Sequence, residues 1–354
     1  MSEGSRPLLA SLTPLTQVAD LKLITSSSYH RLQFYDFPPR CAEPNRSSLA
    51  PRQSSDKWVS DLNLSTQIAS KSFAVIADPV PTTGYLIGDL LPDAELLSVA
   101  STPPSANFRM IIFHTDLTDT SKYPTWRATF SWDAAKNGTV IWNSSATDIS
   151  KRRVHRAVNQ LNLPSLQVDD DLAGDTLVIV KSDQNCGGLA ESRVFGTCDK
   201  PTRVHQIAGL KNYLVCELGD VDKELKQHAQ VVIERYVENT NGAFIRAYRA
   251  GSRLVLSKSE SEDQLKQMGF GKPRTSAFFL RPDADSTSDD LFREAARQAY
   301  LVTSELGLHF GAVDLVIDDM GRPYVCDVNA TPFWEESEPE IEQYLRGGIM
   351  AELG

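Results

Sequence analysis

The segment GAVDLVIDDMGRPYVCDVNATP, residues 311–332, has the pattern of two apolar strands joined by a tight turn at residues 319–321. Two strand-like runs with a short glycine-containing connection predict a β-hairpin. Asp327 and Asn329 lie inside the second strand, and burying a carboxylate without a partner costs several kcal/mol. We therefore expect these two side chains to face a specific partner.

The alternation of side chains along a strand predicts which residues of the second strand share a face. Val325, Asp327 and Asn329 are expected on one face, and Cys326 and Val328 on the other. Two oxygen-bearing side chains then project from the same face, about 7 Å apart along the backbone.

Asp314, in the first strand, completes a candidate metal site. With the turn at residues 319–321, Asp314 is expected nearly opposite Asp327, so that Asp314, Asp327 and Asn329 converge. Such an all-oxygen set suits Mg²⁺, which prefers carboxylates, waters and substrate phosphates. The alternative is that the carboxylates simply pair with Arg or Lys side chains.

The composition is that of a globular protein with room for two domains. The 354 residues are 41% hydrophobic and include no apolar run of membrane-spanning length. A net charge of −10 argues against a general nucleic-acid or anionic-membrane binder. Five scattered cysteines without a C-x-x-C pair, and an N-terminus without an apolar signal core, favour a reduced, cytoplasmic protein.

The first part of the chain predicts a small parallel sheet. Residues 38–56 are rich in Pro, Ser and Arg and are expected to form a loop or linker, preceded by one strand-like run at 31–37. Near-continuous apolar runs of strand length then suit a parallel sheet that is covered on both faces. These runs are 72–80, 94–101 (weaker), 108–117 and 138–145.

The remaining chain alternates helical and strand patterns. We expect a helix over 149–164 that ends at Pro164, and a hairpin that turns at Gly251. Further expected elements are a strand and glycine loop at 175–188, a strand at 229–239, a helix at 289–306 and a terminal helix at 340–353.

Two features of residues 149–354 suggest a nucleotide-binding site. Lys181 ends an apolar strand just before Gly187-Gly188, and a glycine turn with a nearby cation can hold phosphate oxygens. The strand at 229–239 exits through Glu234 and Glu238, where backbone groups could read an adenine and a carboxylate could hold ribose hydroxyls. The alternatives are a solvated turn and an ordinary surface strand end.

Arg246 and Lys258 lie on the hairpin between these features and the candidate metal strands. From either position a cation could reach a phosphoryl group in transfer. The alternative for each is an exposed residue in a salt bridge.

Taken together, residues 70–335 resemble the ATP-grasp superfamily, and its peptide-ligase-like branch most closely. The most specific part is the 311–332 hairpin, which looks like the family's metal-binding hairpin. The resemblance implies an α/β protein with α+β lobes, in which a Rossmann-like parallel-sheet domain precedes the ATP-grasp fold. The expected divisions are a 1–56 extension and linker, a 57–148 Rossmann-like domain, a 149–240 N-lobe and a 241–354 C-lobe.

The resemblance also implies roles for individual residues. Asp314, Asp327 and Asn329 occupy the family's metal-ligand positions, although Glu is commoner at the position of Asp327. Glu238 matches the ribose carboxylate, and Lys151 matches a basic residue that opens the helix before the N-lobe, with Arg152 or Arg153 as substitutes. The implied ATP-binding set is Lys151, Lys181, Gly187, Gly188, Glu234, Arg235, Tyr236, Val237 and Glu238.

Three departures from the family pattern concern the substrate more than the ATP site. Phe244 stands where an acidic residue is frequent, and Asn185 and Cys186 stand in the glycine loop where small or hydroxyl residues are more usual.

The implied activity is an ATP- and Mg²⁺-dependent ligase that activates a carboxylate as an acyl phosphate and joins it to an amine. One or two Mg²⁺ ions, with Mn²⁺ as an alternative, would be held by the hairpin, and Arg246 and Lys258 would act in catalysis. The expected partners are small-molecule carboxylates and amines or peptides, with no nucleic acid or membrane. The resemblance allows a homodimer, because family members are often dimers, and the sequence does not decide between a dimer and a monomer. The alternatives are an ATP-grasp small-molecule kinase and a non-catalytic nucleotide-binding protein.

Overall fold

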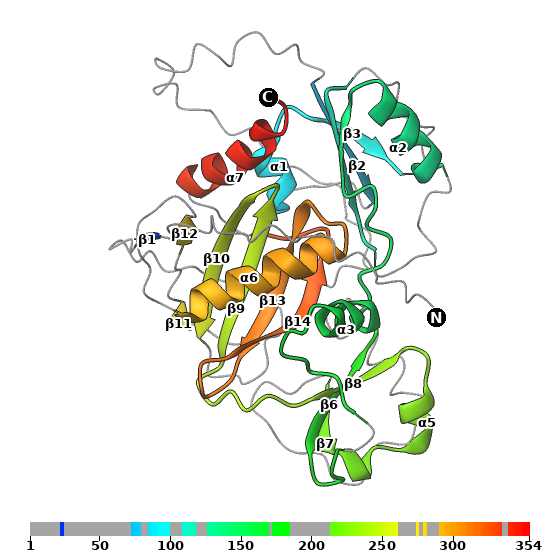
Figure 1. The fold of residues 1–354 in the computed structure, drawn as a ribbon, viewed down its shortest axis with the longest axis vertical. Coiled ribbons are helices and arrows are strands. Elements are labelled where there is room, and N and C mark those ends of the chain that lie inside the picture. The colour runs from blue at the N-terminus through cyan, green and yellow to red at the C-terminus, as the bar shows by residue number, and fades with distance from the viewer. Residues whose placement is uncertain are drawn as a thin grey trace, which may run out of the picture.

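The computed structural model describes residues 22–24, 72–78, 84–99, 108–117, 126–169, 172–184, 213–260, 274–275, 279–281, 290–334 and 339–354. Within them, a four-stranded parallel sheet is followed along the chain by a three-stranded and a five-stranded antiparallel sheet (Figure 1). This succession confirms the predicted fold class. None of the helices in these ranges is both long and apolar enough to cross a membrane.

The parallel sheet is covered on both faces, as predicted. Its strands lie in the order β3-β2-β4-β5. The central strands β2 and β4 are nearly all apolar and are buried on both sides, whereas the edge strand β3 is largely exposed. On one face Ile76 and Phe113 pack against Phe130 and Ala134 of a helix, and on the other Val75 packs towards the C-terminal part. The elements are β2 (Phe73–Asp78), α1 (Leu86–Leu90), β3 (Glu95–Ser98), β4 (Met110–Thr115), α2 (Arg127–Lys136) and β5 (Val140–Trp142).

The three-stranded sheet has a small core of its own. Val178 and Val180 of the central strand pack with Val231 and with Leu225 of α5. Because side chains alternate, Lys181 and Glu234 lie on the opposite face of this sheet. Its elements are β6 (Leu177–Ser182), β7 (Leu214–Glu217), the 3₁₀ turn η2 (Leu218–Asp220), α5 (Lys223–Gln227) and β8 (Val231–Arg235), and the strand order is β7-β6-β8.

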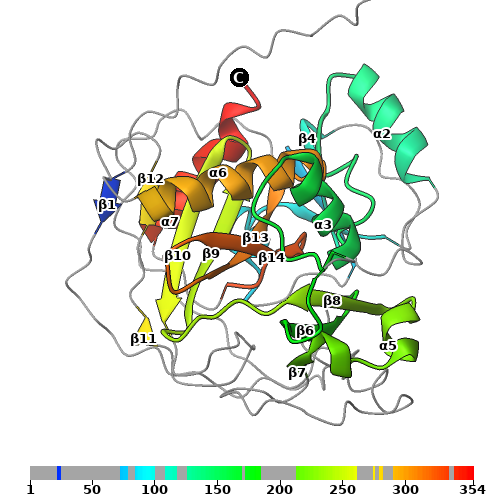
Figure 2. The same cartoon turned by 60° about the horizontal axis from the view of Figure 1, so that its bottom comes forward.

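The five-stranded sheet carries a long helix across one face, as Figures 1 and 2 show. This helix, α6, and the shorter α3 share one hydrophobic cluster with the sheet, whereas the other face packs against α7 and the parallel sheet. The elements are α3 (Lys151–Gln160), β9 (Ala243–Ala250), β10 (Arg253–Glu260), β11 (Arg274–Thr275), α6 (Asp290–Glu305), β13 (Phe310–Ile317), β14 (Pro323–Asn329) and α7 (Pro339–Ala351).

The predicted hairpin at residues 311–332 is present in the structure. Strands β13 and β14 pair in antiparallel fashion around the predicted turn, where Gly321 has a φ of 78°. Asp314 lies directly opposite Asp327, which confirms the predicted register. The predicted hairpin turn at Gly251, with a φ of 62°, is also present between β9 and β10.

The predicted alternation along β14 is wrong for Val325 and Cys326, because the register shifts between Asp314 and Leu315, but Asp327 and Asn329 share a face as predicted. Asp327 pairs with Asp314 and Val325 with Leu315, so Cys326 is an extra residue in a β-bulge. Val325 and Val328 consequently share one face and pack in the cluster beneath α6, whereas Cys326 packs with a different cluster on the side of Asp327.

Some elements differ from the sequence-based expectation. Helix α3 ends at Gln160, four residues before Pro164, because Asn162 adopts a left-handed conformation with a φ of 52°. Helix α2 was not predicted, since its apolar residues follow no helical period. Strand β1 (Lys22–Ile24), which pairs with β12 (Phe279–Arg281), was not predicted either. The expected strand at 31–37 and linker at 38–56 lie outside the described residues.

Candidate active site

The hairpin brings the three predicted metal ligands to one face of the five-stranded sheet. Asp314 and Asp327 are opposite one another, and Asn329 follows two positions later. Each is partly exposed. Local hydrogen bonds fix two of the side chains: Asp327 Oδ1 accepts from the Val328 amide at 2.9 Å, and Asn329 Oδ1 accepts from the Thr331 amide at 2.9 Å.

Arg246 joins this group from the neighbouring strand β9. It is opposite Asp314 in register, and its Nε lies 3.2 Å from Asp314 Oδ1. Burial opposes the charge of Arg246, but the carboxylates of Asp314 and Asp327 outweigh it and raise the guanidinium pKa above its ordinary value. The ion pair that was the alternative to a metal ligand is thus formed at Asp314.

The donor set nevertheless fits Mg²⁺. Two carboxylates on adjacent strands and one carboxamide, all on a partly exposed face, are the hard oxygen ligands that this ion prefers. In the described part of the chain no three His, Cys, Asp or Glu side chains converge on a point. A metal at this hairpin would therefore depend on Asn329 and on ligand oxygens to complete its coordination.

Lys181 lies in a buried charged group on the three-stranded sheet. Its Nζ donates to Glu234 Oε2 at 2.6 Å, and Glu234 Oε1 lies 3.2 Å from Nε2 of His155 on α3. Burial opposes the charge on Lys181, but Glu234 outweighs it and raises the lysine pKa above its ordinary value. Burial would also raise the pKa of Glu234, yet Lys181 and His155 lower it to about 2.

Both Glu234 oxygens are thus engaged by protein groups. A direct contact to a nucleotide at this position would have to come from the Glu234 backbone or follow from release of Lys181. His155 was not identified from the sequence. It lies four residues after Lys151 on the same helix, and this spacing, which places both on one helix face, was the available signal.

The two sheets meet around Cys326. Burial raises the pKa of this thiol to about 12. Lys181 acts on the same thiol in the opposite direction, whereas Asp314, Asp327 and Glu234 raise its pKa further. The lysine of β6 and the carboxylates of the hairpin therefore act on the same thiol. Sequence analysis did not identify Cys326 as a site residue.

Helix α3 begins at this region and carries the predicted Lys151. Lys151 is buried, and its Nζ donates to the carbonyl of Gln184 at 3.2 Å, just beyond β6. The proposed substitutes are used elsewhere: Arg152 donates to backbone carbonyls around β8, and Arg153 pairs with Glu305 at 3.2 Å. The four glycine-loop residues considered above, Asn185, Cys186, Gly187 and Gly188, lie outside the described residues.

The segment after β8 runs past an apolar surface. Leu166, Phe244, Val316 and Tyr324 form a buried cluster against which Val237 and Cys326 pack. The amides of Arg235 and Tyr236 donate to the carbonyls of Leu166 and Leu177, at 2.8 Å and 2.9 Å. Val237, by contrast, forms no backbone hydrogen bond with the part of the chain that the structure describes. Glu238 is exposed, and its carbonyl accepts from the Asp319 amide at 3.1 Å.

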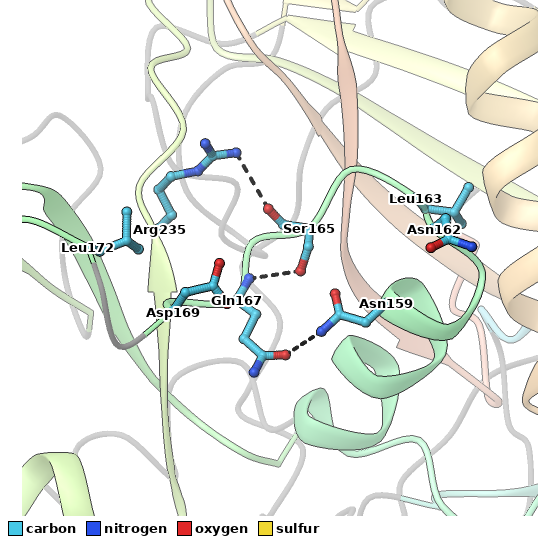
Figure 3. Close-up of a pocket in the computed structure, with 8 residues that line it drawn as sticks. All are labelled: Asn159, Asn162, Leu163, Ser165, Gln167, Asp169, Leu172 and Arg235. Atoms are coloured by element: carbon cyan, nitrogen blue, oxygen red, sulfur yellow. Dashed lines mark hydrogen bonds between the residues drawn. The ribbon is translucent and has the colours of Figure 1, made fainter.

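The side chain of Arg235 lines a polar groove of about 530 Å³ (Figure 3). In the register of β6 and β8, it lies on the opposite face of the sheet from Lys181. There its guanidinium donates to the Ser165 carbonyl at 3.4 Å, and nearby Asn159 donates to Gln167 Oε1 at 2.5 Å. The groove lies between the end of α3 and β8, so Arg235 is the only predicted ATP-binding residue, among those that the structure describes, that lines it. Any nucleotide contact of Arg235 in this arrangement would use its backbone.

Lys258 is not brought to the group. It is opposite Ile245, whose side chain packs in the cluster beneath α6, so Lys258 is on the other face of the sheet from Arg246. Its Nζ pairs with Glu260 Oε1 at 2.9 Å.

No family model and no curated protein matches the sequence. Among solved structures, the chain is similar to the ATP-grasp ligase PsnB complexed with minimal precursor, with 14% identity, coverage of 80% of this chain and 99% of that chain, and a TM-score of 0.46. It is also similar to the D-cycloserine synthetase DcsG, with 16% identity, coverage of 80% and 99%, and a TM-score of 0.45. D-alanine–D-alanine ligase from Bacillus anthracis complexed with ATP follows at 11% identity, coverage of 79% and 94%, and a TM-score of 0.41.

Proposed function

We propose that this protein is an ATP- and Mg²⁺-dependent ligase that joins a carboxylate to an amine. The observation that carries the proposal is the convergence of a buried lysine from one antiparallel sheet with two carboxylates and an arginine from the other. Lys181, Asp314 and Asp327 all act electrostatically on the thiol of Cys326, and Arg246 pairs with Asp314. Cations next to an oxygen-ligand set are what a metal-bound polyphosphate requires.

The nucleotide would lie between the 149–240 and 241–354 lobes. The apolar cluster of Leu166, Phe244, Val316 and Tyr324 offers a wall for the adenine, beside which the Val237 backbone could form the base-reading hydrogen bonds. The exposed Glu238 is placed at the segment's end, where a carboxylate could accept from ribose hydroxyls.

The phosphates would be held from two sides. Lys151 and Lys181 neutralise the α- and β-phosphates, and the glycines of the following loop add backbone amides. Asp314, Asp327 and Asn329 would hold one or two Mg²⁺ ions, or Mn²⁺ in their place, and the metal would supply positive charge to neutralise the phosphates. Arg246, already charged and oriented by Asp314, would stabilise the γ-phosphoryl group during transfer.

The side chains at the site favour a carboxylate as the phosphoryl acceptor. A carboxylate is ionised at neutral pH and needs no general base, whereas a sugar hydroxyl does. Among the described residues near Arg246, Asp314 is held by the arginine, Asp327 would be engaged as a metal ligand, and Cys326, with a pKa of about 12, is a neutral thiol. The carboxylate would displace ADP to give an acyl phosphate. The amine, as its free base, would then displace inorganic phosphate from the acyl carbon, and the departing phosphate would take the proton that the amine loses.

A phosphate-release screen with ATP, Mg²⁺ and crossed pools of carboxylates and amines tests this proposal. The expected result is stoichiometric ADP and inorganic phosphate that depend on one acid and one amine together. ADP with a phosphorylated product and no free phosphate would instead identify a small-molecule kinase. Binding of ATP without turnover in any pool would indicate a nucleotide-binding protein without catalysis.

A further inference from the structure

Three charged or titratable side chains from three separate elements form one chain of contacts inside the N-lobe. His155 comes from α3, Glu234 from β8 and Lys181 from β6. Glu234 links the other two, at 3.2 Å to His155 Nε2 and 2.6 Å to Lys181 Nζ. The side chains of His155 and Glu234 are only 7% and 1% exposed, so water cannot replace either contact without opening the structure.

The contact to Glu234 is the sole hydrogen bond of the His155 ring among the described residues. Its other nitrogen, Nδ1, is buried and has no hydrogen-bond partner in the part of the chain that the structure describes. A buried polar atom without a partner has an energetic cost. An apolar side chain would fill this position without that cost. The position of the ring suits one purpose, which is to hold the second oxygen of Glu234.

We propose that His155 is a positioning residue, which fixes the Glu234 carboxylate and through it aims the Lys181 ammonium at the nucleotide phosphates. The inference rests on the proposed ATP-dependent function. A carboxylate held at one oxygen only can rotate about its terminal bond, and the lysine bonded to it would move with it. With both oxygens held, Lys181 stays in one place before any phosphate arrives, which lowers the ordering cost of binding.

Helix α3 carries both His155 and Lys151, the second lysine that is predicted to contact the phosphates. Lys151 and His155 are one turn apart on the same helix face. The helix is docked to the end of β6, since the Lys151 amide donates to the Asp183 carbonyl at 3.2 Å and the Arg152 amide to Asp183 Oδ1 at 2.9 Å. One helix therefore places Lys151 directly and Lys181 through Glu234.

The test compares His155→Leu, which removes the ring nitrogens, with His155→Gln, whose amide can donate from nearly the position of Nε2. ATP and adenosine affinities are measured by isothermal titration in the presence of Mg²⁺. We expect His155→Leu to weaken ATP binding about tenfold, the scale of one charge-assisted contact, and to leave adenosine binding unchanged. His155→Gln should recover most of the loss. Arg156→Gln, on the exposed side of α3, should change neither affinity.

A double-mutant cycle with Lys181→Ala tests whether His155 affects the ATP affinity through Lys181. In the Lys181→Ala background, His155→Leu should change the ATP affinity by less than about twofold, because the group that it positions is gone. Equal losses for ATP and adenosine, or losses that multiply in the double variant, would overturn the inference in favour of a purely structural role.

A measurement without nucleotide separates this inference from the proposed function. If the wild-type protein binds no ATP, the proposed function is wrong, and the positioning claim is decided by acetylation of Lys181, followed by mass spectrometry of the folded protein. We expect Lys181 to be acetylated at least several times faster in His155→Leu than in wild type or His155→Gln. Equal acetylation rates in all three proteins would contradict the claim.

Discussion

Glu234 is a carboxylate with 1% side-chain exposure, held between a lysine and a histidine. Its pKa in the folded protein is about 2, against an ordinary value of 4.5. A carboxyl group whose folded pKa is lowered stabilises the fold above its unfolded pKa. That contribution is lost as the pH falls from about 4.5 towards about 2.

We expect Glu234→Gln to lower the free energy of unfolding at pH 7 by about 3 kcal/mol, because it leaves Lys181 charged and buried without its partner. The same variant should lose the part of the decrease in stability between pH 4.5 and pH 2 that comes from protonation of Glu234. Urea unfolding followed by circular dichroism across this range measures both effects. Glu238→Gln is the control, since Glu238 is exposed and should shift stability by no more than about 0.5 kcal/mol.

Cys326 provides a second test at this scale. Burial, opposed by Lys181, raises its pKa to about 12, so its thiolate fraction at pH 8 is on the order of 1 in 10,000. Iodoacetamide at pH 8 should therefore leave Cys326 unmodified in the folded protein and modify it rapidly in urea, as measured by peptide mass spectrometry. Modification of the folded protein at the rate of the urea-unfolded chain would contradict this environment.

At the scale of elements, the sequence predicted the 311–332 hairpin, its turn and the pairing of Asp314 with Asp327. It could not predict the bulge at Cys326, because a cysteine fits an apolar face as well as a polar one. The alternation therefore gave the wrong face for Val325, although Asp327 and Asn329 still project together. The sequence did not identify His155 because its contact partner, Glu234, lies 79 positions away in the chain.

The end of α6 is fixed by a close contact at Gly307. This glycine has a φ of 72°, and a Cβ there would lie 3.1 Å from the backbone carbonyl carbon of Ser145 and 3.2 Å from the amide of Ala146. Helices often end at such a left-handed glycine. Here the glycine also lets the segment after β5 approach the end of the helix.

We expect Gly307→Ala to destabilise the protein by about 3 kcal/mol, from the strain of a positive φ and the displaced segment at Ser145. Gly321→Ala is the matched control, because Gly321 has a φ of 78° but a Cβ at this position would meet no described atom within 4 Å. It should cost only the backbone strain, about 1 kcal/mol. If both variants lowered the free energy of unfolding in urea by the same amount, the contact with Ser145 would not contribute to stability.

At the scale of the whole molecule, Asn143 joins the parallel sheet to the five-stranded sheet. It is fully buried with a φ of 59°. Its Nδ2 donates to the carbonyls of Phe113 and Phe310, at 3.0 Å and 2.8 Å. Its Oδ1 accepts from the amides of His309 and Phe310, at 2.8 Å and 3.0 Å. One side chain thereby satisfies backbone groups of β4 and of the start of β13.

We expect Asn143→Ala to lower the free energy of unfolding by about 3 kcal/mol, since buried backbone groups lose their partners, and to split the thermal transition of the two sheets. Differential scanning calorimetry measures both. Asn162→Ala is the control: Asn162 has a similar φ of 52° but is exposed, so it should cost at most about 1 kcal/mol. A single unshifted transition in Asn143→Ala would contradict the linking role.

The order of the sheets was predictable from the sequence, but the contacts between them were not. Periodicity reports which residues of one element share a face, whereas Asn143 meets Phe310 across 167 positions. The same limit applies to the site. The oxygen ligands of the hairpin lie on neighbouring strands and could be found, whereas the face of Lys258 depended on the register of β9 with β10.

The central claim is that the hairpin and Lys181 together hold a metal-bound ATP. Isothermal titration with the non-hydrolysable analogue AMP-PNP, with Mg²⁺ or with EDTA, tests it without knowledge of the substrates. We predict that the wild type binds at least tenfold more tightly with Mg²⁺. The double variant Asp327→Ala/Asn329→Ala should lose that dependence while unfolding at the wild-type temperature, and Asp133→Ala, an exposed carboxylate on α2, should keep it. No binding by the wild type, or an unchanged Mg²⁺ dependence in the double variant, would contradict the claim.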